Sequence, residues 1–255
     1  MATDTASKKV ARRLRNAYRV LRGQTVVGSS DAERNRRDDQ ALLMVMAAVL
    51  RPDSCCVDVG AHSGSFLNEM VRIAPQGRHI AFEPLKDFAA EMAARFPNVD
   101  VRNVALSDRN GEAQFMRRPM AAISSLETVP EGEDPETWRG PILDDAQRVT
   151  VPVRRLDAEL PSGFVPSLIK IDVEGVENAV LAGMQTTLAN HRPVIAVEHS
   201  IGATHHGYEA GGIYELLAPH GLRIFDADGN GPYSQEHLVE TVLGGQMWFY
   251  FAFPG

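Results

Sequence analysis

The sequence predicts an α/β fold in which helices cover both faces of a mostly parallel sheet. Short apolar runs alternate with segments of helical periodicity, and a glycine turn joins the first such run to a helix. The chain has 255 residues, 44% of them hydrophobic, which is enough for one sizeable core. We therefore expect one sheet-based domain, preceded by a basic N-terminal segment.

The order of the elements follows from the hydrophobic pattern. Helices are expected at residues 40–50, 66–71, 85–96 and 176–188. Strands are expected at residues 55–59, 79–82, 99–101, 113–116, 149–153, 168–171, 194–197, 222–225 and 247–251. Strand–helix–strand repeats favour right-handed parallel crossovers, and the last two strands are expected to form an antiparallel pair at one sheet edge. Residues 117–147 show no strong period, so they are a candidate loop or lid.

Residues 1–39 are expected to form a basic helix and a polar link, with the domain itself at residues 40–255. The basic side chains are Lys8, Lys9, Arg12, Arg13, Arg15, Arg19 and Arg22. Apolar residues at helical spacing among them favour packing on the domain or in a homo-oligomer over contact with anionic lipid or nucleic acid.

Composition narrows the classes of partner. The net charge of −7 and the pI near 5.6 argue against nucleic acid. No apolar run is long enough to span a membrane, and the N-terminus lacks a signal-peptide pattern, so we expect a cytoplasmic protein. The two cysteines are adjacent, which predicts buried thiols and no disulfide framework.

The glycine turn after the first strand is the first candidate binding element, because α/β sheets bind ligands beyond the carboxyl ends of their strands. Gly60 and Gly64 would let the backbone pass close to a ligand. Asp58 disfavours a pyrophosphate there but suits a cationic amino group. Ala61 and His62 also leave less room for a diphosphate. A nicotinamide dinucleotide is thus the second choice.

Glu83 ends the next strand, where a carboxylate can accept hydrogen bonds from both ribose hydroxyls. A solvated strand-end carboxylate is the alternative for this residue alone. Its position after Asp58 and Gly60 favours ribose binding.

Several motifs, in this order, resemble the FkbM-type methyltransferases. They are VDVGAHSGSF (57–66), FEP (82–84), NVALSD (103–108), GEAQF (111–115), LDAEL (156–160) and LIKIDVEGVE (168–177). The resemblance covers about residues 57–200, with a weaker match to the C-terminus, and the last motif is the most specific. His62 stands where the family often has asparagine.

The resemblance implies a Rossmann-like class I methyltransferase fold, with a seven-stranded, mostly parallel sheet and an antiparallel C-terminal strand. It implies S-adenosylmethionine as the cofactor and O-methylation of a hydroxyl on a sugar, polyketide or other natural product. The implied cofactor-binding residues are Asp58, Gly60, Ala61, His62, Gly64, Ser65, Glu83, Asn103, Ala105, Ser107 and Asp172. Of these, Asp58, Gly60 and His62 would line the methionine end, and residues 103–108 would flank the adenine.

The catalytic residues are expected at the ends of two neighbouring strands. Lys170 and Glu177 are interpreted as structural, with Lys170 paired to Asp172. Asp172 lies at a strand end beside the expected sulfonium, so we expect it to orient the cofactor or the acceptor. Glu198 or His199, at the end of the next strand, is the candidate base.

Three alternatives remain at this point. A metal site formed by Glu198 with His199, His205 and His206 matches no known zinc spacing, so we expect no metal. A nicotinamide-dependent oxidoreductase and a non-catalytic nucleotide-binding module share the same fold class. The leading hypothesis is a methyltransferase acting on a small-molecule hydroxyl.

Overall fold

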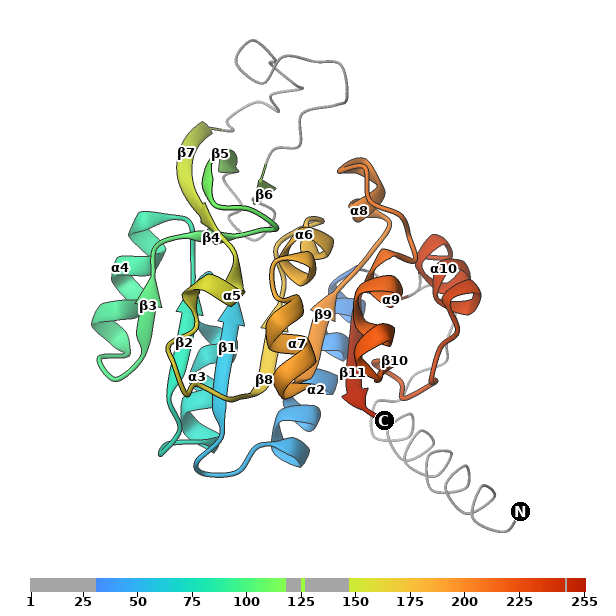
Figure 1. Ribbon diagram of the computed structural model, residues 1–255, viewed down its shortest axis with the longest axis horizontal. Coiled ribbons are helices and arrows are strands. Elements are labelled where there is room, and N and C mark those ends of the chain that lie inside the picture. The colour runs from blue at the N-terminus through green and yellow to red at the C-terminus, as the bar shows by residue number, and fades with distance from the viewer. Residues whose placement is uncertain (1–30, 118–124, 127–146, 246) are drawn as a thin grey trace.

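A seven-stranded sheet with strand order β10-β11-β9-β8-β1-β2-β3 runs through the molecule (Figure 1). The computed structural model describes residues 31–117, 125–126, 147–245 and 247–255. The strands are β1 (Cys55–Val59), β2 (His79–Phe82), β3 (Asp100–Arg102), β8 (Pro166–Ile171), β9 (Val194–Glu198), β10 (Leu222–Asp226) and β11 (Phe249–Pro254). Only β11 pairs antiparallel with its neighbours β9 and β10. The predicted mostly parallel sheet with an antiparallel C-terminal strand is confirmed.

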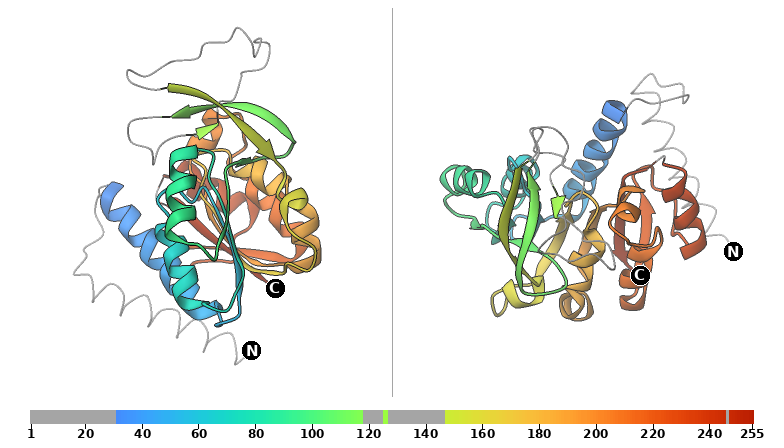
Figure 2. Two further views of the ribbon diagram at one scale, coloured as in Figure 1. Left: turned by 90° about the vertical axis from the view of Figure 1, so that its left-hand side faces the viewer. Right: turned by 90° about the horizontal axis from the view of Figure 1, so that it is seen from above.

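Alternation along the strands gives the sheet two apolar faces. Val57, Ile169 and Ile195 point to one face, which is covered by α5 (Leu156–Glu159), α6 (Glu177–Ala182), α7 (Gln185–His191), α9 (Gly212–Leu217) and α10 (Gln235–Leu243). Leu168 and Ala196 point to the other face, which is covered by α2 (Asp31–Val49), α3 (Ser65–Ile73) and α4 (Lys86–Arg95). The left view in Figure 2 shows the two helical layers on opposite sides of the sheet.

Helix α2 begins nine residues earlier than expected, at Asp31 instead of Gln40. The prediction of a link reaching residue 39 is therefore wrong from Asp31 onward. Its charged first half hides the helix in the sequence pattern, whereas its second half packs Leu42 and Met46 on the sheet. The expected basic helix at residues 8–22 lies outside the described residues.

A second, four-stranded sheet lies beside the carboxyl-terminal edge of the first. It has the order β4-β7-β5-β6, with strands β4 (Ala105–Leu106), β5 (Gly111–Arg117), β6 (Ser125–Leu126) and β7 (Gln147–Arg154). The strands expected at residues 113–116 and 149–153 are therefore present, as β5 and β7, but they belong to this separate sheet. Its inner side chains Phe115, Val151 and Val153 pack with Leu85 and Val176 from the main domain. Apart from β6, the candidate lid between β5 and β7 lies outside the described residues.

The helix expected at residues 176–188 is divided into α6 and α7. Gly183 lies at the break, where a Cβ atom would come within 2.0 Å of the Ser107 carbonyl oxygen. This close approach explains both the glycine and the change of helix direction. Shorter helical turns are α8 (Gly202–His205) and η2 (Ala218–His220). Within the described ranges, no helix has the length and apolar character needed to cross a bilayer.

Candidate active site

A cavity of about 270 Å³ lies at the carboxyl-terminal ends of β1, β2, β8 and β9. This is the edge at which open α/β sheets bind ligands. The predicted site residues that line it are Gly60, Ala61, His62, Ser65, Glu83, Ala105, Asp172 and Glu198. Segments that are far apart in the sequence therefore meet at one cavity, as the connectivity of parallel strands requires.

The glycine turn is held against the end of β8. Gly60 has a φ of +70°, and a Cβ atom on it would lie 1.9 Å from the Asp172 carbonyl oxygen. Gly64 also has a positive φ, but a Cβ atom there would meet the Phe96 ring. Gly60 thus shapes the cavity wall, whereas Gly64 packs α3 against α4 and does not line the cavity.

Glu83 is a buried carboxylate that joins two turns. Its Oε2 accepts a hydrogen bond from the His62 amide at 2.9 Å, and its Oε1 accepts one from the Leu85 amide at 2.8 Å. Burial raises the pKa of Glu83, although these amide hydrogen bonds oppose the shift. Each carboxylate oxygen keeps a further lone pair that a ligand hydroxyl in the cavity could use.

Two residues predicted to flank the adenine support the cavity from outside. Asn103 donates from its amide to the carbonyl oxygens of Glu83 and Pro84, at 2.9 and 2.8 Å. The Ser107 hydroxyl donates to Asp108, and neither Asn103 nor Ser107 lines the cavity. Asn103 thus holds the backbone of the β2 turn, Ser107 bonds a neighbouring side chain, and neither side chain faces the cavity.

Lys170 is the buried centre of an ionic group behind the glycine turn. Its Nζ lies 3.4 Å from Asp58 Oδ1 and 3.3 Å from Asp172 Oδ2, and it donates to the Gly60 carbonyl at 3.0 Å. Burial alone would lower the pKa of Lys170, but the carboxylates of Asp172 and Asp58 raise it above its ordinary value. The predicted Lys170–Asp172 pair is confirmed.

The same group corrects the prediction for Asp58. This side chain is only 1% exposed and does not line the cavity. Its negative charge is paired with Lys170 and is not available to the amino group of a ligand. Asp58 therefore positions the turn through Lys170, which bonds the Gly60 carbonyl.

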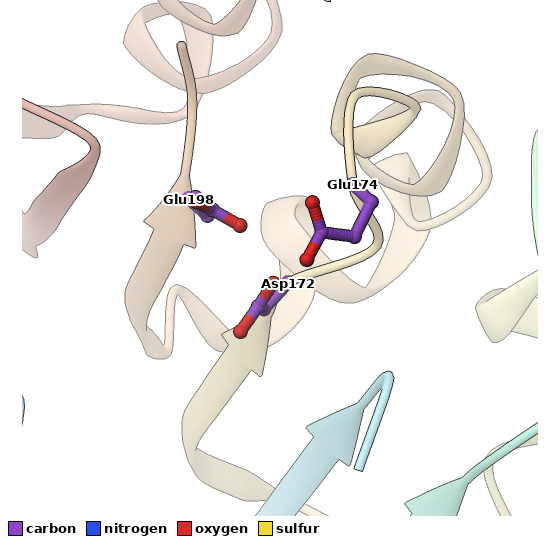
Figure 3. A group of neighbouring side chains, drawn as sticks. All are labelled: Asp172, Glu174 and Glu198. Atoms are coloured by element: carbon purple, nitrogen blue, oxygen red, sulfur yellow. The ribbon is translucent and has the colours of Figure 1, made fainter. Parts of the chain in front are cut away.

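Three carboxyl groups converge where β8 and β9 end. Figure 3 shows Asp172, Glu174 and Glu198 directed toward one another, and oxygens of all three lie within 4.8 Å of each other. Burial and the neighbouring Asp172 charge raise the pKa of Glu198 well above its usual range. Burial opposes ionisation of Asp172 too, but Lys170 and a hydrogen bond with Glu198 lower its pKa. Within this pair Glu198 therefore holds a proton more tightly than Asp172 does.

His199 does not reach the cavity, which contradicts the prediction that it could act as the base. Its ring is fully buried on the opposite face of β9 from Glu198, and its Nε2 donates to the Ala210 carbonyl at 2.9 Å. Successive strand residues point to opposite faces, so only one of the two neighbours could face the cavity.

Glu177 has the structural role expected for it. Its carboxylate accepts hydrogen bonds from the amides of Val173 and Gly175, at 3.2 and 2.9 Å. Burial raises the pKa of Glu177 to about 7, in spite of these bonds. The residue thus shapes the turn that follows Asp172.

The sequence patterns missed the part of the cavity formed by α2 and the start of β11. Asn35, Asp38 and Asp39 line it from α2, and Trp248 and Phe249, which contact α2, line it beside them. Acidic residues ahead of an apolar helix resemble a solvated link, and no local signal places them beside β9. Val104 and Leu106 also line the cavity, and they lie in the predicted segment 103–108, whereas the apolar lining residue Phe115 was missed.

Comparison with known proteins shows two curated relatives. The chain is 30% identical over 212 residues to the AMB antimetabolite synthetase AmbE of Pseudomonas aeruginosa, covering 69% of this chain and 10% of AmbE. It is 27% identical over 170 residues to the 2-O-methyltransferase NoeI of Sinorhizobium fredii, covering 58% of this chain and 64% of NoeI. The chain thus spans less than two thirds of each relative.

Solved structures with a similar chain course are methyltransferases. One is the methyltransferase FkbM from Methylobacillus flagellatus, with 16% identity, a TM-score of 0.48, and coverage of 84% of this chain and 47% of that one. Another is an O-methyltransferase from Bacillus cereus in complex with SAH, with 13% identity, a TM-score of 0.46, and coverage of 100% and 98%.

The family model for the methyltransferase FkbM domain matches residues 58–224. That segment begins at Asp58 on β1 and ends on β10, so it contains the glycine turn, Glu83 and the carboxyl groups that end β8 and β9. The sheet has the seven-stranded class I arrangement that the resemblance predicted. The chain belongs to the FkbM methyltransferase family.

Proposed function

We propose that this protein transfers a methyl group from S-adenosylmethionine to a hydroxyl oxygen of a small molecule, such as a sugar, a polyketide or another natural product. One observation carries the proposal: the cavity combines a glycine turn and a buried carboxylate, Glu83, with an acidic end at Asp172 and Glu198. Membership of the FkbM family supports methyl transfer. The likeness to NoeI, which is named a 2-O-methyltransferase, supports oxygen as the acceptor atom.

The residues present fit this cofactor. Glu83 offers lone pairs for ribose hydroxyls, and Leu106 and Phe115 offer an apolar surface for the adenine. The carboxylate of Asp172 lies in the same cavity and suits a positive charge. When bound, the cofactor would supply a methyl group on a positively charged sulfur; the acceptor oxygen would bond that carbon as the carbon–sulfur bond breaks, with neutral S-adenosylhomocysteine as the leaving group.

Glu198 and Asp172 have separate tasks in this proposal. Asp172 stays ionised because Lys170 holds its charge, so it can orient a cation or a hydroxyl. Glu198, once deprotonated, accepts the proton of the acceptor hydroxyl. A positioned base of this kind contributes roughly 10²–10⁴-fold to the rate, and alignment of the reacting atoms contributes more.

Two measurements test the proposal. Calorimetric titration of the protein with S-adenosylhomocysteine and with NADH should show binding of the first and none of the second. Incubation with methyl-labelled S-adenosylmethionine and a panel of hydroxylated sugars and polyketides should then yield a labelled ether. Binding of NADH alone would contradict the proposal, and binding of S-adenosylhomocysteine with label only on amines or thiols would contradict the choice of oxygen.

A further inference from the structure

One side of the cavity is more acidic than a cofactor site requires. We call it the acidic wall, and it consists of Asp38 and Asp39 on α2 together with Asp172, Glu174 and Glu198. Helix α2 lies outside residues 58–224, the segment that matches the family model. The acidic wall therefore includes residues that lie outside the segment matched by the family model.

The cavity lining contains more acidic than basic side chains, although Arg37, which does not line the cavity, pairs with Asp38. Among the cavity-lining residues that the structure describes, Lys170 is the one charged base, and its charge is held by Asp58 and Asp172. Burial and the Lys170 charge lower the pKa of His62, which favours its neutral form. Even with a proton on Glu198, the lining keeps an excess of negative charge. Such a surface attracts a cation and repels an anion.

Asp38 adds an independent observation. Its side chain is only 2% exposed, and burial raises its pKa although Arg37 and backbone hydrogen bonds from Phe249 and Trp248 oppose the shift; among the described residues, no hydrogen bond of ordinary geometry reaches its Oδ2. Its other oxygen, Oδ1, lies 3.3 Å from the Arg37 Nε atom. A buried carboxylate oxygen without a partner is costly, and Asp38 lines the cavity, where a ligand N–H could reach it.

Asp39 lies next to Asp38, at the exposed rim of the same cavity. Burial and the negative charge of Asp172 raise the pKa of Asp39, while Lys170 opposes the shift. The carboxylate of Asp39 therefore lies within electrostatic reach of the end of β8. A positive group bound between α2 and β8 would interact favourably with both Asp39 and Asp172.

We propose that the methyl acceptor carries an ammonium group, which binds to Asp38 and Asp39 while its hydroxyl faces Glu198. The expected class is a small amino alcohol or amino sugar. This inference rests on the proposed function, because the acceptor needs a methyl donor in the other part of the cavity. It adds the charge of the acceptor, which nothing in the family assignment specifies.

The test uses three small primary alcohols whose other end is cationic, neutral or anionic: 4-aminobutan-1-ol, butan-1-ol and 4-hydroxybutanoate. Each is titrated into the protein saturated with S-adenosylhomocysteine, and binding is followed by ligand-observed NMR. The amine should bind at least about tenfold more tightly than either of the others, as expected for one close ion pair near the surface. Equal binding, or a preference for the neutral or anionic probe, overturns the proposal.

Variants of Asp39 test whether this residue causes the preference for the amine. Asp39→Asn should remove most of the preference for the amine, and Asp39→Glu should retain it. Glu91→Gln, an equal change of charge on the exposed side of α4, should leave the preference intact and serves as the control. An Asp39→Asn protein that keeps the full preference overturns the proposal.

The complex with S-adenosylhomocysteine also shows whether a metal ion occupies the acidic wall in place of an ammonium group. Mg²⁺ is titrated in parallel, and binding that is lost in Glu174→Gln, without any preference for the amine, would assign the acidic wall to a metal ion and overturn the proposal. Absence of S-adenosylhomocysteine binding would instead refute the proposed function. The two failures are therefore distinguishable.

Discussion

At the scale of single residues, Glu198 is the group whose ionisation the fold opposes most clearly. Burial and the Asp172 charge raise its pKa, so the folded protein binds its proton more tightly than the unfolded chain does. Stability from this proton is present below the ordinary glutamate pKa and is lost as the pH rises through the raised value. The residue therefore costs stability in the pH range where a base must be ionised.

Glu198→Gln should therefore separate stability from activity. We expect a higher Tm than the parent protein at mildly alkaline pH, with a smaller difference in acid, together with a loss of turnover of roughly 10²–10⁴-fold. Calorimetry at the two pH values and transfer of labelled methyl measure the two effects. Glu91→Gln, on the surface, should show neither, and an equal fall in Tm at both pH values for Glu198→Gln would contradict this account.

Lys170 gives a second prediction at this scale. Lys170→Met leaves the carboxylates of Asp58 and Asp172 without their shared cation, and breaking such a buried pair costs about 3–5 kcal/mol. Urea unfolding should show this loss in the free energy of unfolding. Adding Asp58→Asn to Lys170→Met should recover part of it, whereas no recovery would mean that Lys170 acts mainly through its bond to Gly60.

Which residues lie near the site was easier to predict from the sequence than which groups their side chains contact. Strand alternation could have excluded His199 once Glu198 was taken to face the cavity, because neighbours on β9 point to opposite faces. The role of Asp58 could not be predicted in this way. Whether a strand-end carboxylate meets a ligand or a lysine depends on the register of β1 against β8, which brings Asp58 opposite Lys170.

At the scale of elements, the glycine turn is the most sensitive part of the site. Gly60→Ala would place a Cβ atom 1.9 Å from the Asp172 carbonyl oxygen, so the β1 turn or the end of β8 must move. We expect binding of S-adenosylhomocysteine to weaken by at least about tenfold, on top of a backbone cost of about 1–2 kcal/mol. Calorimetric titration and urea unfolding measure these effects.

Gly163→Ala is the matched control for this prediction. Gly163 has a similar φ of +71°, but no atom lies within 4 Å of a Cβ built on it. This variant should show the backbone cost alone and bind S-adenosylhomocysteine normally. Equal loss of binding in both variants would mean that global stability, and not the contact with β8, controls the site.

Elements formed by local hydrophobic periodicity were predictable, and elements decided by long-range contacts were not. Except for β3, which is Asp-Val-Arg, the strands of the main sheet are mostly apolar runs, and each strand was expected within a few residues of its observed place. The start of α2 is masked by a run of charged residues, of which Asp38 and Asp39 line the cavity. The second sheet and the α6–α7 break depend on contacts with distant segments, such as Gly183 against Ser107.

At the scale of the whole molecule, the two sheets contribute different parts of the cavity lining. The parallel strands bring four turns to one edge, while the β4-β7-β5-β6 sheet supplies Ala105, Leu106 and Phe115 to the same cavity. The antiparallel β10–β11 pair adds Phe249 at one end of β11 and otherwise completes the core. A ligand in the cavity should therefore stabilise a set of segments that are remote in sequence but adjacent in space.

Hydrogen exchange with and without S-adenosylhomocysteine tests this arrangement. A ligand that binds only the folded state at about 100 times its Kd adds about 2.7 kcal/mol to the free energy of unfolding, which slows exchange through global opening everywhere. Local protection should exceed this baseline only at residues 60–66, 83–85, 104–106 and 172–176, which line or adjoin the cavity. Helix α10, which does not line the cavity, is the internal control. Excess protection that is confined to α10 and β10 would place the binding site elsewhere on the molecule.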